Sequence, residues 1–171
     1  IRETDIFVNH LEEITGQKVT DKYSSARGRL IDAMVDGHKY IFGKKAVVFG
    51  EEDLVVGITS FLAEIGIHPV ICASGGKSGR LQDAINRVME DISAPVPTVL
   101  EDVDFYDITS LAKEKKVDLV VGHSKGYSFS REENIPLIRV GFPIHDRVGG
   151  QRILHLGYHG AQYLYDLITN S

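Results

Sequence analysis

Cysteine is almost absent from this sequence, because Cys72 is the only one among 171 residues. A single cysteine cannot form a disulfide within the chain, nor can it hold a metal cluster through thiolates alone. Disulfide frameworks are typical of oxidising compartments, and a chain without one is typical of the reducing cytoplasm. We therefore expect a cytoplasmic protein, with no metal ligand of its own.

Long apolar runs and an excess of basic residues are also missing. The longest apolar runs are about five residues, whereas a helix that crosses a bilayer needs roughly 20. The first ten residues, IRETDIFVNH, lack the apolar segment of a signal peptide. A net charge of −5 does not provide the clustered Lys and Arg that nucleic-acid binding requires. We expect neither a membrane nor a nucleic acid as a partner.

The composition is otherwise that of a folded globular protein. Hydrophobic residues make up 43% of the chain and charged residues 25%, both ordinary values. This length is sufficient for one domain with its own core, with or without an ordered arm. Because the first residue is Ile1 rather than Met, we expect a piece of a longer protein.

The apolar spacing within residues 1–43 predicts a helical arm. The first helix has apolar residues at helical spacing, namely Ile6, Phe7, Leu11 and Ile14. Gly16 is placed to end it. A second helix is expected over residues 21–42, closed by Gly43, with an apolar stripe formed by Leu30, Ile31, Met34, Val35 and His38. Since this arm contains no strand, we expect it to pack against another structure.

From residue 44 onward, short apolar runs alternate with helical stretches. The expected strands are residues 46–49, 69–72, 98–100, 119–121 and 137–140. The expected helices are residues 52–65, 79–91, 105–115 and, at the end of the chain, 160–170. This alternation predicts an α/β fold with a parallel sheet, and strands that are apolar throughout are typical of a sheet covered on both faces. Residues 44–171 are therefore expected to form a Rossmann-like domain of about five strands.

The expected strand order of the doubly wound sheet, 3-2-1-4-5, predicts where a ligand cleft would lie. In such sheets the order reverses between the first and fourth strands, and ligands bind at the carboxyl ends of those two strands. The segments that follow these strands are residues 50–53, GEED, and residues 122–127, GHSKGY. We expect any pocket to open between them.

Phosphate binding has weak support in the sequence. The turn after the first strand offers Glu51, Glu52 and Asp53 instead of glycines, and these carboxylates would repel a dinucleotide. The loop GGKSGR at residues 75–80 lacks Walker A spacing. An ordinary strand-to-helix loop is the preferred interpretation, and an anion-binding nest that includes Lys77 is the alternative.

The pattern G-x-S-x-G at residues 122–126 is typical of the nucleophile elbow of a serine hydrolase. Ser124 would be the nucleophile, and Asp146 and His155 follow in the chain order of such triads. However, the segment after Ser124 has room only for a short helix, and no oxyanion-hole loop is apparent. A serine hydrolase is therefore kept as the alternative function.

Three histidines near the end of the chain form a candidate metal group: His145, His155 and His159. Gly157 between the last two favours a turn over a shared helix face, so ordinary hydrogen-bonded loop histidines are the preferred interpretation. Asp146 and Arg147 follow His145 directly, and a charge-assisted contact among them would fasten the loop.

Several stretches, in one order along the chain, resemble the β-type subunits of the nitrogenase component 1 family. They are residues 25–32 with 38–39, then 50–57, 61–66, 122–127, 135–139 and 156–160. The most specific stretch is VGFPIHDR at residues 140–147. The HDR of that stretch and the GGQR at residues 149–152 look nearer to alternative-nitrogenase or cofactor-scaffold β chains than to the usual molybdenum β chain.

The resemblance implies three Rossmann-like domains per subunit, of which this chain would be the C-terminal one. It also implies an iron–sulfur cluster held by N-terminal cysteines and α-type subunits, and two partners, an α-type subunit and an iron-protein reductase. The function would be nitrogen fixation or assembly of the iron–molybdenum cofactor, through subunit pairing and reductase docking. The piece by itself is expected to be inactive.

The resemblance implies no catalytic residue, cofactor ligand or metal ligand in this chain. In α-type sister subunits a histidine before the Gly-Tyr turn binds the cofactor, and His145 lies in the corresponding region. Its spacing to Gly157 differs from that pattern. We expect His145 to be a loop residue, with cofactor ligation as the minority alternative.

Overall fold

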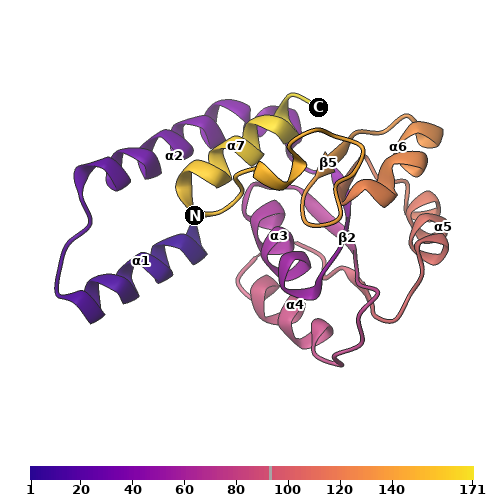
Figure 1. Cartoon of the computed structure of the whole chain (residues 1–171), viewed down its shortest axis with the longest axis horizontal. Coiled ribbons are helices and arrows are strands. Elements are labelled where there is room, and N and C mark those ends of the chain that lie inside the picture. The colour runs from indigo at the N-terminus through magenta and orange to yellow at the C-terminus, as the bar shows by residue number, and fades with distance from the viewer. Residues whose placement is uncertain (93) are drawn as a thin grey trace. The chain divides into compact units, whose positions relative to one another are not determined.

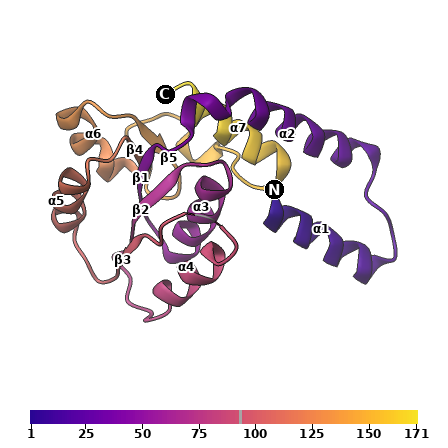
Figure 2. The same ribbon diagram turned by 180° about the vertical axis from the view of Figure 1, so that it is seen from behind.

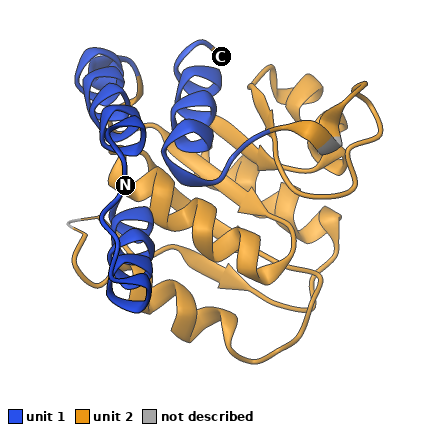
Figure 3. Ribbon diagram, turned by 60° about the vertical axis from the view of Figure 1, so that its left-hand side comes forward, with its two compact units in different colours: residues 1–40, 154–170 blue, residues 41–153, 171 orange. Residues whose placement is uncertain are grey.

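The computed structural model describes residues 1–92 and 94–171, which form two compact units (Figures 1 and 3). Unit 1 consists of residues 1–40 and 154–170, and unit 2 of residues 41–153 and 171. Unit 1 thus joins the N-terminal helices to the C-terminal helix. Residue spacing alone does not predict this grouping, because periodicity says which face of a helix is buried but not against which element.

Unit 2 is built on a parallel sheet with the order β3-β2-β1-β4-β5, which confirms the predicted fold class and strand order. The strands are β1 (Lys45–Phe49), β2 (His68–Ala73), β3 (Thr98–Leu100), β4 (Leu119–Gly122) and β5 (Leu137–Arg139). The central strand β1 pairs with β2 on one side and β4 on the other, so that Val48 lies beside both Cys72 and Val121. The sequence therefore predicts each strand to within about one residue at either end.

Helices cover both faces of this sheet, as Figure 2 shows. They are α3 (Glu52–Glu64), α4 (Leu81–Met89), α5 (Phe105–Lys115) and the short α6 (Tyr127–Glu133). α3 and α4 lie on one face, and α5 and α6 on the other. Beneath α5 and α6, buried Ile108, Ala112 and Phe129 pack against Val47 and Phe49 of β1. The apolar strands are thus buried from both sides, as the sequence pattern predicts.

The sole cysteine lies inside this core. Cys72 is fully buried on β2, and its sulfur lies 3.0 Å from the hydroxyl of Thr59 on α3. Burial raises the pKa of the Cys72 thiol to about 12, an effect that the hydrogen bond with Thr59 only partly offsets. Because the thiolate is the reactive form, this side chain behaves as a small apolar residue.

Unit 1 consists of α1 (Arg2–Thr15), α2 (Asp21–Ile41, of which residues up to 40 belong to this unit) and α7 (Gly157–Thr169). Gly16 ends α1 in the left-handed conformation (φ 66°), as predicted. The core of the unit contains Ala26, Leu30 and Tyr158, joined by Ile1, Val8, Met34 and Ala161. Among the described residues no helix is long and apolar enough to cross a membrane.

Asp5 links the three helices of unit 1. Its carboxylate accepts hydrogen bonds from Nε of Arg27 at 2.9 Å, from Nη2 of Arg27 at 2.7 Å and from the hydroxyl of Tyr158 at 2.7 Å. The hydrogen bonds from Arg27 hold the pKa of Asp5 below its usual value. Burial, helped by the bond to Asp5, raises the pKa of Tyr158 to about 12. The network fixes α1 through its polar face.

The apolar face of α1 points away from that network. Ile1, Asp5, Val8 and Glu12 are the partly buried residues of one side, whereas Ile6, Phe7, Leu11 and Ile14 are 43–81% exposed. A helix on the surface of a globular protein normally buries its apolar stripe. The inverted arrangement leaves a contiguous apolar strip in contact with water, which favours association.

We expect the isolated chain to self-associate through this strip. Sedimentation velocity over a concentration range should show an average mass that rises with concentration. Replacing Phe7→Lys together with Ile14→Lys should abolish the rise, because both side chains lie on the exposed apolar face. The control is Asn9→Lys, at an exposed polar position of the same helix. A mass independent of concentration in the wild-type chain would contradict the prediction.

We also expect Cys72 to resist alkylation in the native protein. At pH 8 a thiol with a pKa of about 12 is almost wholly protonated and, on β2, shielded from solvent. Iodoacetamide should therefore label the chain only after unfolding in urea, as read by mass spectrometry. A Glu114→Cys variant, which adds an exposed thiol on α5, provides the positive control and should be labelled once in the folded state.

Candidate functional site at the carboxyl edge of the sheet

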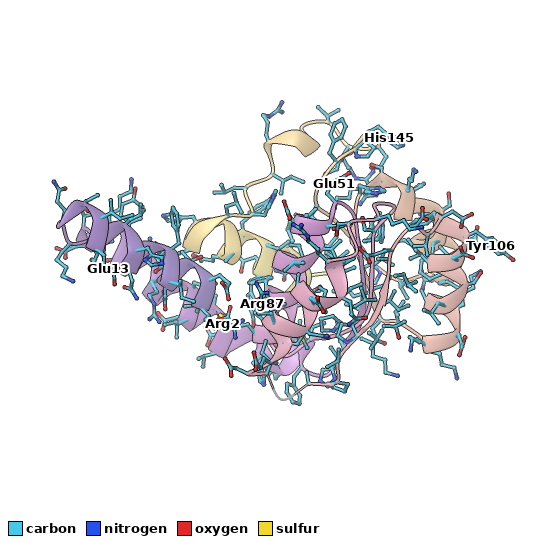
Figure 4. All side chains as sticks on the ribbon, turned by 90° about the horizontal axis from the view of Figure 1, so that it is seen from below. Arg2, Glu13, Glu51, Arg87, Tyr106 and His145 are labelled. Atoms are coloured by element: carbon cyan, nitrogen blue, oxygen red, sulfur yellow. The ribbon has the colours of Figure 1, made fainter. Side chains whose placement is uncertain are left out.

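A cleft of about 640 Å³ opens at the carboxyl ends of β1, β2 and β4. Its lining includes Gly50 and Glu51 after β1, and His123 and Lys125 after β4, so the predicted pocket position is confirmed. Its apolar walls are Phe49, Val103, Phe105, Ile108, Phe142 and Pro143. Figure 4 shows Glu51 and His145 toward the same end of unit 2. The cleft thus lies where a doubly wound sheet reverses its strand order.

Gly122, at the end of β4, controls the direction of the chain at this edge. A Cβ atom there would lie 2.6 Å from both the carbonyl oxygen and a ring carbon of Phe49, so only glycine fits. The side chains of the next two residues, His123 and Ser124, then lie in different environments. His123 lines the cleft, where its ring meets Phe49 edge-on with 4.9 Å between ring centroids, and Ser124 is buried.

His123 is a neutral group in this setting. Its partial burial lowers its pKa, helped by the positive charge of Lys125 and opposed by the negative charge of Glu51. The backbone N–H of Lys125 donates to Nδ1 at 3.4 Å, which assigns the imidazole proton to Nε2. The cleft is therefore lined by a neutral imidazole and aromatic rings, and its exposed charged residues are Glu51, Asp104 and Lys125.

Behind the cleft, Ser124 takes part in a hydrogen-bond cluster that we name the Asp146 clamp, formed by Ser124, Arg139 and Asp146. The hydroxyl of Ser124 donates to Asp146 at 2.5 Å and accepts from the backbone N–H of His145 at 3.0 Å. Arg139, on β5, donates to both carboxylate oxygens of Asp146, with Nε at 3.0 Å and Nη2 at 2.6 Å. The clamp closes the loop of residues 140–146 onto the ends of β4 and β5.

The electrostatics of the clamp follow from its geometry. The side chains of Arg139 and Asp146 are only 13% and 19% exposed. Because burial removes water from both charges, their mutual attraction is needed to offset the lost solvation. The hydrogen bonds from Arg139 hold the pKa of Asp146 far below its usual range, against the opposing effect of burial. Arg147 adds a weaker contact, with 3.7 Å between its Nη1 and the Asp146 carboxylate.

This geometry does not support a hydrolase at Ser124. In a catalytic triad an imidazole lies between the hydroxyl and the carboxylate, so that it can remove the hydroxyl proton. Here the carboxylate binds the hydroxyl directly, and the side chain of Ser124 is buried. His155 belongs to the other compact unit. The helix after Ser124, α6, has seven residues, as short as the sequence indicates.

The glycine-rich loop at residues 75–80 binds side chains of the protein itself. Glu52 accepts from both the backbone N–H (3.1 Å) and the hydroxyl of Ser78. Glu101 accepts from the backbone N–H of Gly79 at 3.0 Å, and Lys77 pairs with Asp102 at 2.7 Å. The donors of Ser78, Gly79 and Lys77 are thus bound by carboxylates, which supports the ordinary strand-to-helix loop.

The three candidate histidines lie in two different segments. His145 is exposed in the loop after β5, whereas His155 precedes α7 and His159 lies in its first turn. In the part of the chain that the structure describes, no three or more His, Cys, Asp or Glu side chains are grouped to hold a metal ion. Ligation of a cofactor by His145 stays an untested alternative.

Arg139 is the residue that sequence reasoning missed. It was assigned only to a strand and to a resembling stretch, although it is the one charged residue in the apolar run 137–140. A charge at the end of a buried strand requires a partner of opposite sign, and that is the signal that was available. Asp146 was expected to contact Arg147, and it does, but Arg139 is its main partner.

The fold and this cleft define a doubly wound α/β domain, and comparisons with known proteins define its family. Residues 1–171 match the nitrogenase component 1 type oxidoreductases. The nitrogenase molybdenum-iron protein β chain of Methanococcus maripaludis is 39% identical, aligned to 100% of this chain and 37% of its own length. The nitrogenase iron-iron protein β chain of Rhodobacter capsulatus is 33% identical, aligned to 100% of this chain and 38% of its own length.

A solved structure of nitrogenase Cp1 at pH 6.5 superposes with a TM-score of 0.95 at 35% identity, over 99% of this chain and 37% of that one. The chain therefore belongs to the nitrogenase component 1 family, and within it to the β type. It spans a little more than a third of the length of these relatives. Over the whole chain, the molybdenum-iron β chain is more similar than the iron-iron β chain. The nearness of the HDR and GGQR stretches to alternative-nitrogenase or cofactor-scaffold β chains stays a prediction.

We expect the Asp146 clamp to stabilise unit 2 in a pH-dependent way. Asp146→Asn should lower the free energy of unfolding by about 2 kcal/mol at pH 7, the scale of hydrogen bonds to a charged group. Because the folded-state pKa is lowered, the difference between wild type and variant should be fully present above about pH 5. It should shrink as the pH falls below the unfolded-state value of about 4.

Urea unfolding followed by circular dichroism from pH 7 to pH 3 measures this difference. The control is Asp102→Asn, which removes an ion pair with Lys77 whose side chains are 59% and 74% exposed. An exposed pair contributes little, so this variant should unfold like the wild type. Equal free energies of unfolding for Asp146→Asn and Asp102→Asn at pH 7 would show that the clamp does not stabilise the protein.

Proposed function

We propose that this chain is the C-terminal domain of a β-type subunit, which pairs with an α-type subunit in a nitrogenase component 1 complex. The complex would take part in nitrogen fixation or in assembly of the iron–molybdenum cofactor, in the cytoplasm. The observation that carries the proposal is the superposition on Cp1, which has a TM-score of 0.95 over 99% of this chain. In this proposal residues 1–43 are the connecting arm and residues 44–171 the Rossmann-like domain.

The role of the domain within the complex is structural. Its cysteine is buried and its thiol has a pKa of about 12, so Cys72 is unsuited to ligate iron. Its candidate nucleophile, Ser124, is held by Asp146. The iron–sulfur cluster would be held by cysteines of other segments and by the α-type subunit, and electrons would come from an iron-protein reductase that docks on the assembled pair.

The cleft fits this role better than it fits catalysis. A general base needs a pKa near the working pH and access to a substrate proton. The His123 imidazole has a lowered pKa, and its Nδ1 accepts a backbone hydrogen bond. The remaining lining combines aromatic and aliphatic side chains with glycines, Ser74 and the charged Glu51, Asp104 and Lys125. Among the described residues, the imidazole thus lacks a hydrogen-bond partner that would hold it as a general base, which supports a role in contact with other protein surfaces over proton transfer.

The test is co-expression of the complete β-type subunit with a tagged α-type subunit. We expect a stoichiometric complex that contains iron and sulfide, whereas the 171-residue chain purified alone should contain neither. Iron and acid-labile sulfide analyses of both preparations measure the difference. A β-type subunit that never co-purifies with an α-type subunit would sink the proposal, as would a stoichiometric cluster in the isolated chain.

The hydrolase alternative is tested in the same preparation of the isolated chain. We expect no turnover of an activated ester above background, because the Ser124 hydroxyl has no imidazole between it and Asp146. The matched variant is Ser124→Ala. Turnover in the wild-type chain that disappears in this variant would establish the alternative and contradict the structural role.

A further inference from the structure

Helix α1 is attached to the rest of unit 1 through its polar face. Among the described residues of α1 none is buried, and the large apolar side chains of Phe7, Leu11 and Ile14 are exposed. In an ordinary surface helix, burial of such side chains provides most of the free energy of packing. Because that contribution is missing here, the attachment of α1 depends on the contacts of its other side.

The apolar contact on that side is incomplete. Ile1 and Val8 are only partly buried, and they pack against the cluster of Ala26, Leu30 and Tyr158. A recess of about 260 Å³, lined by side chains of α1, α2 and α7, lies beside this contact. Close-packed protein interiors leave no space of that size. The apolar contact of α1 is therefore smaller than its length allows.

Asp5 supplies the charged part of the attachment. Its carboxylate accepts from Arg27 on α2 and from the hydroxyl of Tyr158 on α7, each at 2.7 Å. The side chains of Arg27 and Asp5 are 42% and 29% exposed, so salt and water screen the pair in part. Contacts of this kind open at a lower free energy than the unfolding of a buried core.

The far end of α1 has the features of a hinge. Gly16 is left-handed, and residues 16–20, all exposed and without secondary structure, connect α1 to α2 (Figures 1 and 2). Glu12 accepts from the backbone N–H of Val19 at 2.8 Å and from Nζ of Lys18 at 2.7 Å. Glu12 thus binds the connecting segment, and these two contacts are able to move together with α1.

We propose that α1 is a hinged strap, which opens from α2 and α7 as one unit about residues 16–20 and is held shut by the Asp5 contacts. Opening uncovers part of the apolar cluster formed by Ala26, Leu30 and Tyr158. Salt, which weakens the Asp5 contacts, thereby controls how much apolar surface unit 1 exposes. The strap does not depend on the proposed subunit pairing.

Hydrogen–deuterium exchange of the complete β-type subunit, resolved by peptide mass spectrometry, measures the opening. A lone helix of 14 residues is marginal in water, so α1 loses its helical hydrogen bonds when it opens. Its amides should exchange as a group, and faster than those of α2 and α7. Asp5→Asn should accelerate this exchange about tenfold or more, because hydrogen bonds to a charged group are lost. Added NaCl should accelerate exchange in the wild type and have little effect in Asp5→Asn.

Two tyrosines of α7 provide a matched pair of variants. Both are buried, and Tyr158 donates to Asp5, whereas Tyr165 donates to the backbone carbonyl of Met34 on α2 at 3.1 Å. Tyr158→Phe should accelerate exchange in α1 several-fold, and Tyr165→Phe should leave it unchanged. Lys18→Gln should also leave it unchanged, because the ion pair of Lys18 with Glu12 lies within the strap and its connection.

Each outcome decides the proposal. An α1 that exchanges no faster than α2 and α7 would overturn the strap, and this is the result expected if another segment of the subunit covers α1. Fast exchange in α1 that is equal in the wild type, Asp5→Asn and Tyr158→Phe would overturn the role of Asp5. Peptides from unit 2 report in the same experiment that each variant is folded.

Discussion

The carboxylate of Asp146 is the group on which the geometry of the sheet edge depends. It is mostly buried, and a buried charge is tolerated only where partners replace the lost water. Arg139 supplies the opposite charge from the end of β5, and Ser124 supplies a hydroxyl from the turn after β4. One side chain thereby joins the ends of β4 and β5 to the loop that follows β5. The wall of the cleft that contains Phe142 and Pro143 is positioned by the same interaction.

The clamp also explains why the hydrolase-like pattern G-x-S-x-G occurs at residues 122–126 without a catalytic serine. Gly122 is required because the Phe49 backbone and ring leave no room for a Cβ atom. Ser124 follows as the partner of a carboxylate that arrives from the loop after β5. The pattern G-x-S-x-G therefore records a tight turn with a buried hydroxyl, and both requirements are structural. Whether such a serine is a nucleophile depends on the group that accepts its proton, and this group is not part of the pattern.

Local patterns allowed most of the fold to be predicted, whereas side-chain pairing did not follow from them. The ranges Thr98–Leu100 and Phe105–Lys115 agree with the sequence prediction. The ends of the helix are set locally, by the Asp104 side chain that caps its start and by Lys116, which is left-handed at its end. α4 begins at Leu81 rather than residue 79 because Gly79 has a left-handed backbone conformation (φ 70°), which an α-helix does not contain. The pairing of Arg139 with Asp146 spans a loop whose path no local rule specifies. The grouping of α1, α2 and α7 in one unit could not be predicted for the same reason, because it depends on contacts between residues distant in sequence.

The exposed surfaces carry information that the buried ones do not. The core of unit 2 is that of any doubly wound domain, its cleft holds a neutral imidazole, and the serine behind the cleft is buried and hydrogen-bonded to Asp146. By contrast, α1 turns its apolar face to solvent, and Phe142 and Val148 are exposed in the loop at residues 141–149. Stability alone would favour burying these side chains, and a binding surface requires them to remain available. These two exposed apolar surfaces lie in different units, and each would lose its contact with water only against a further protein surface.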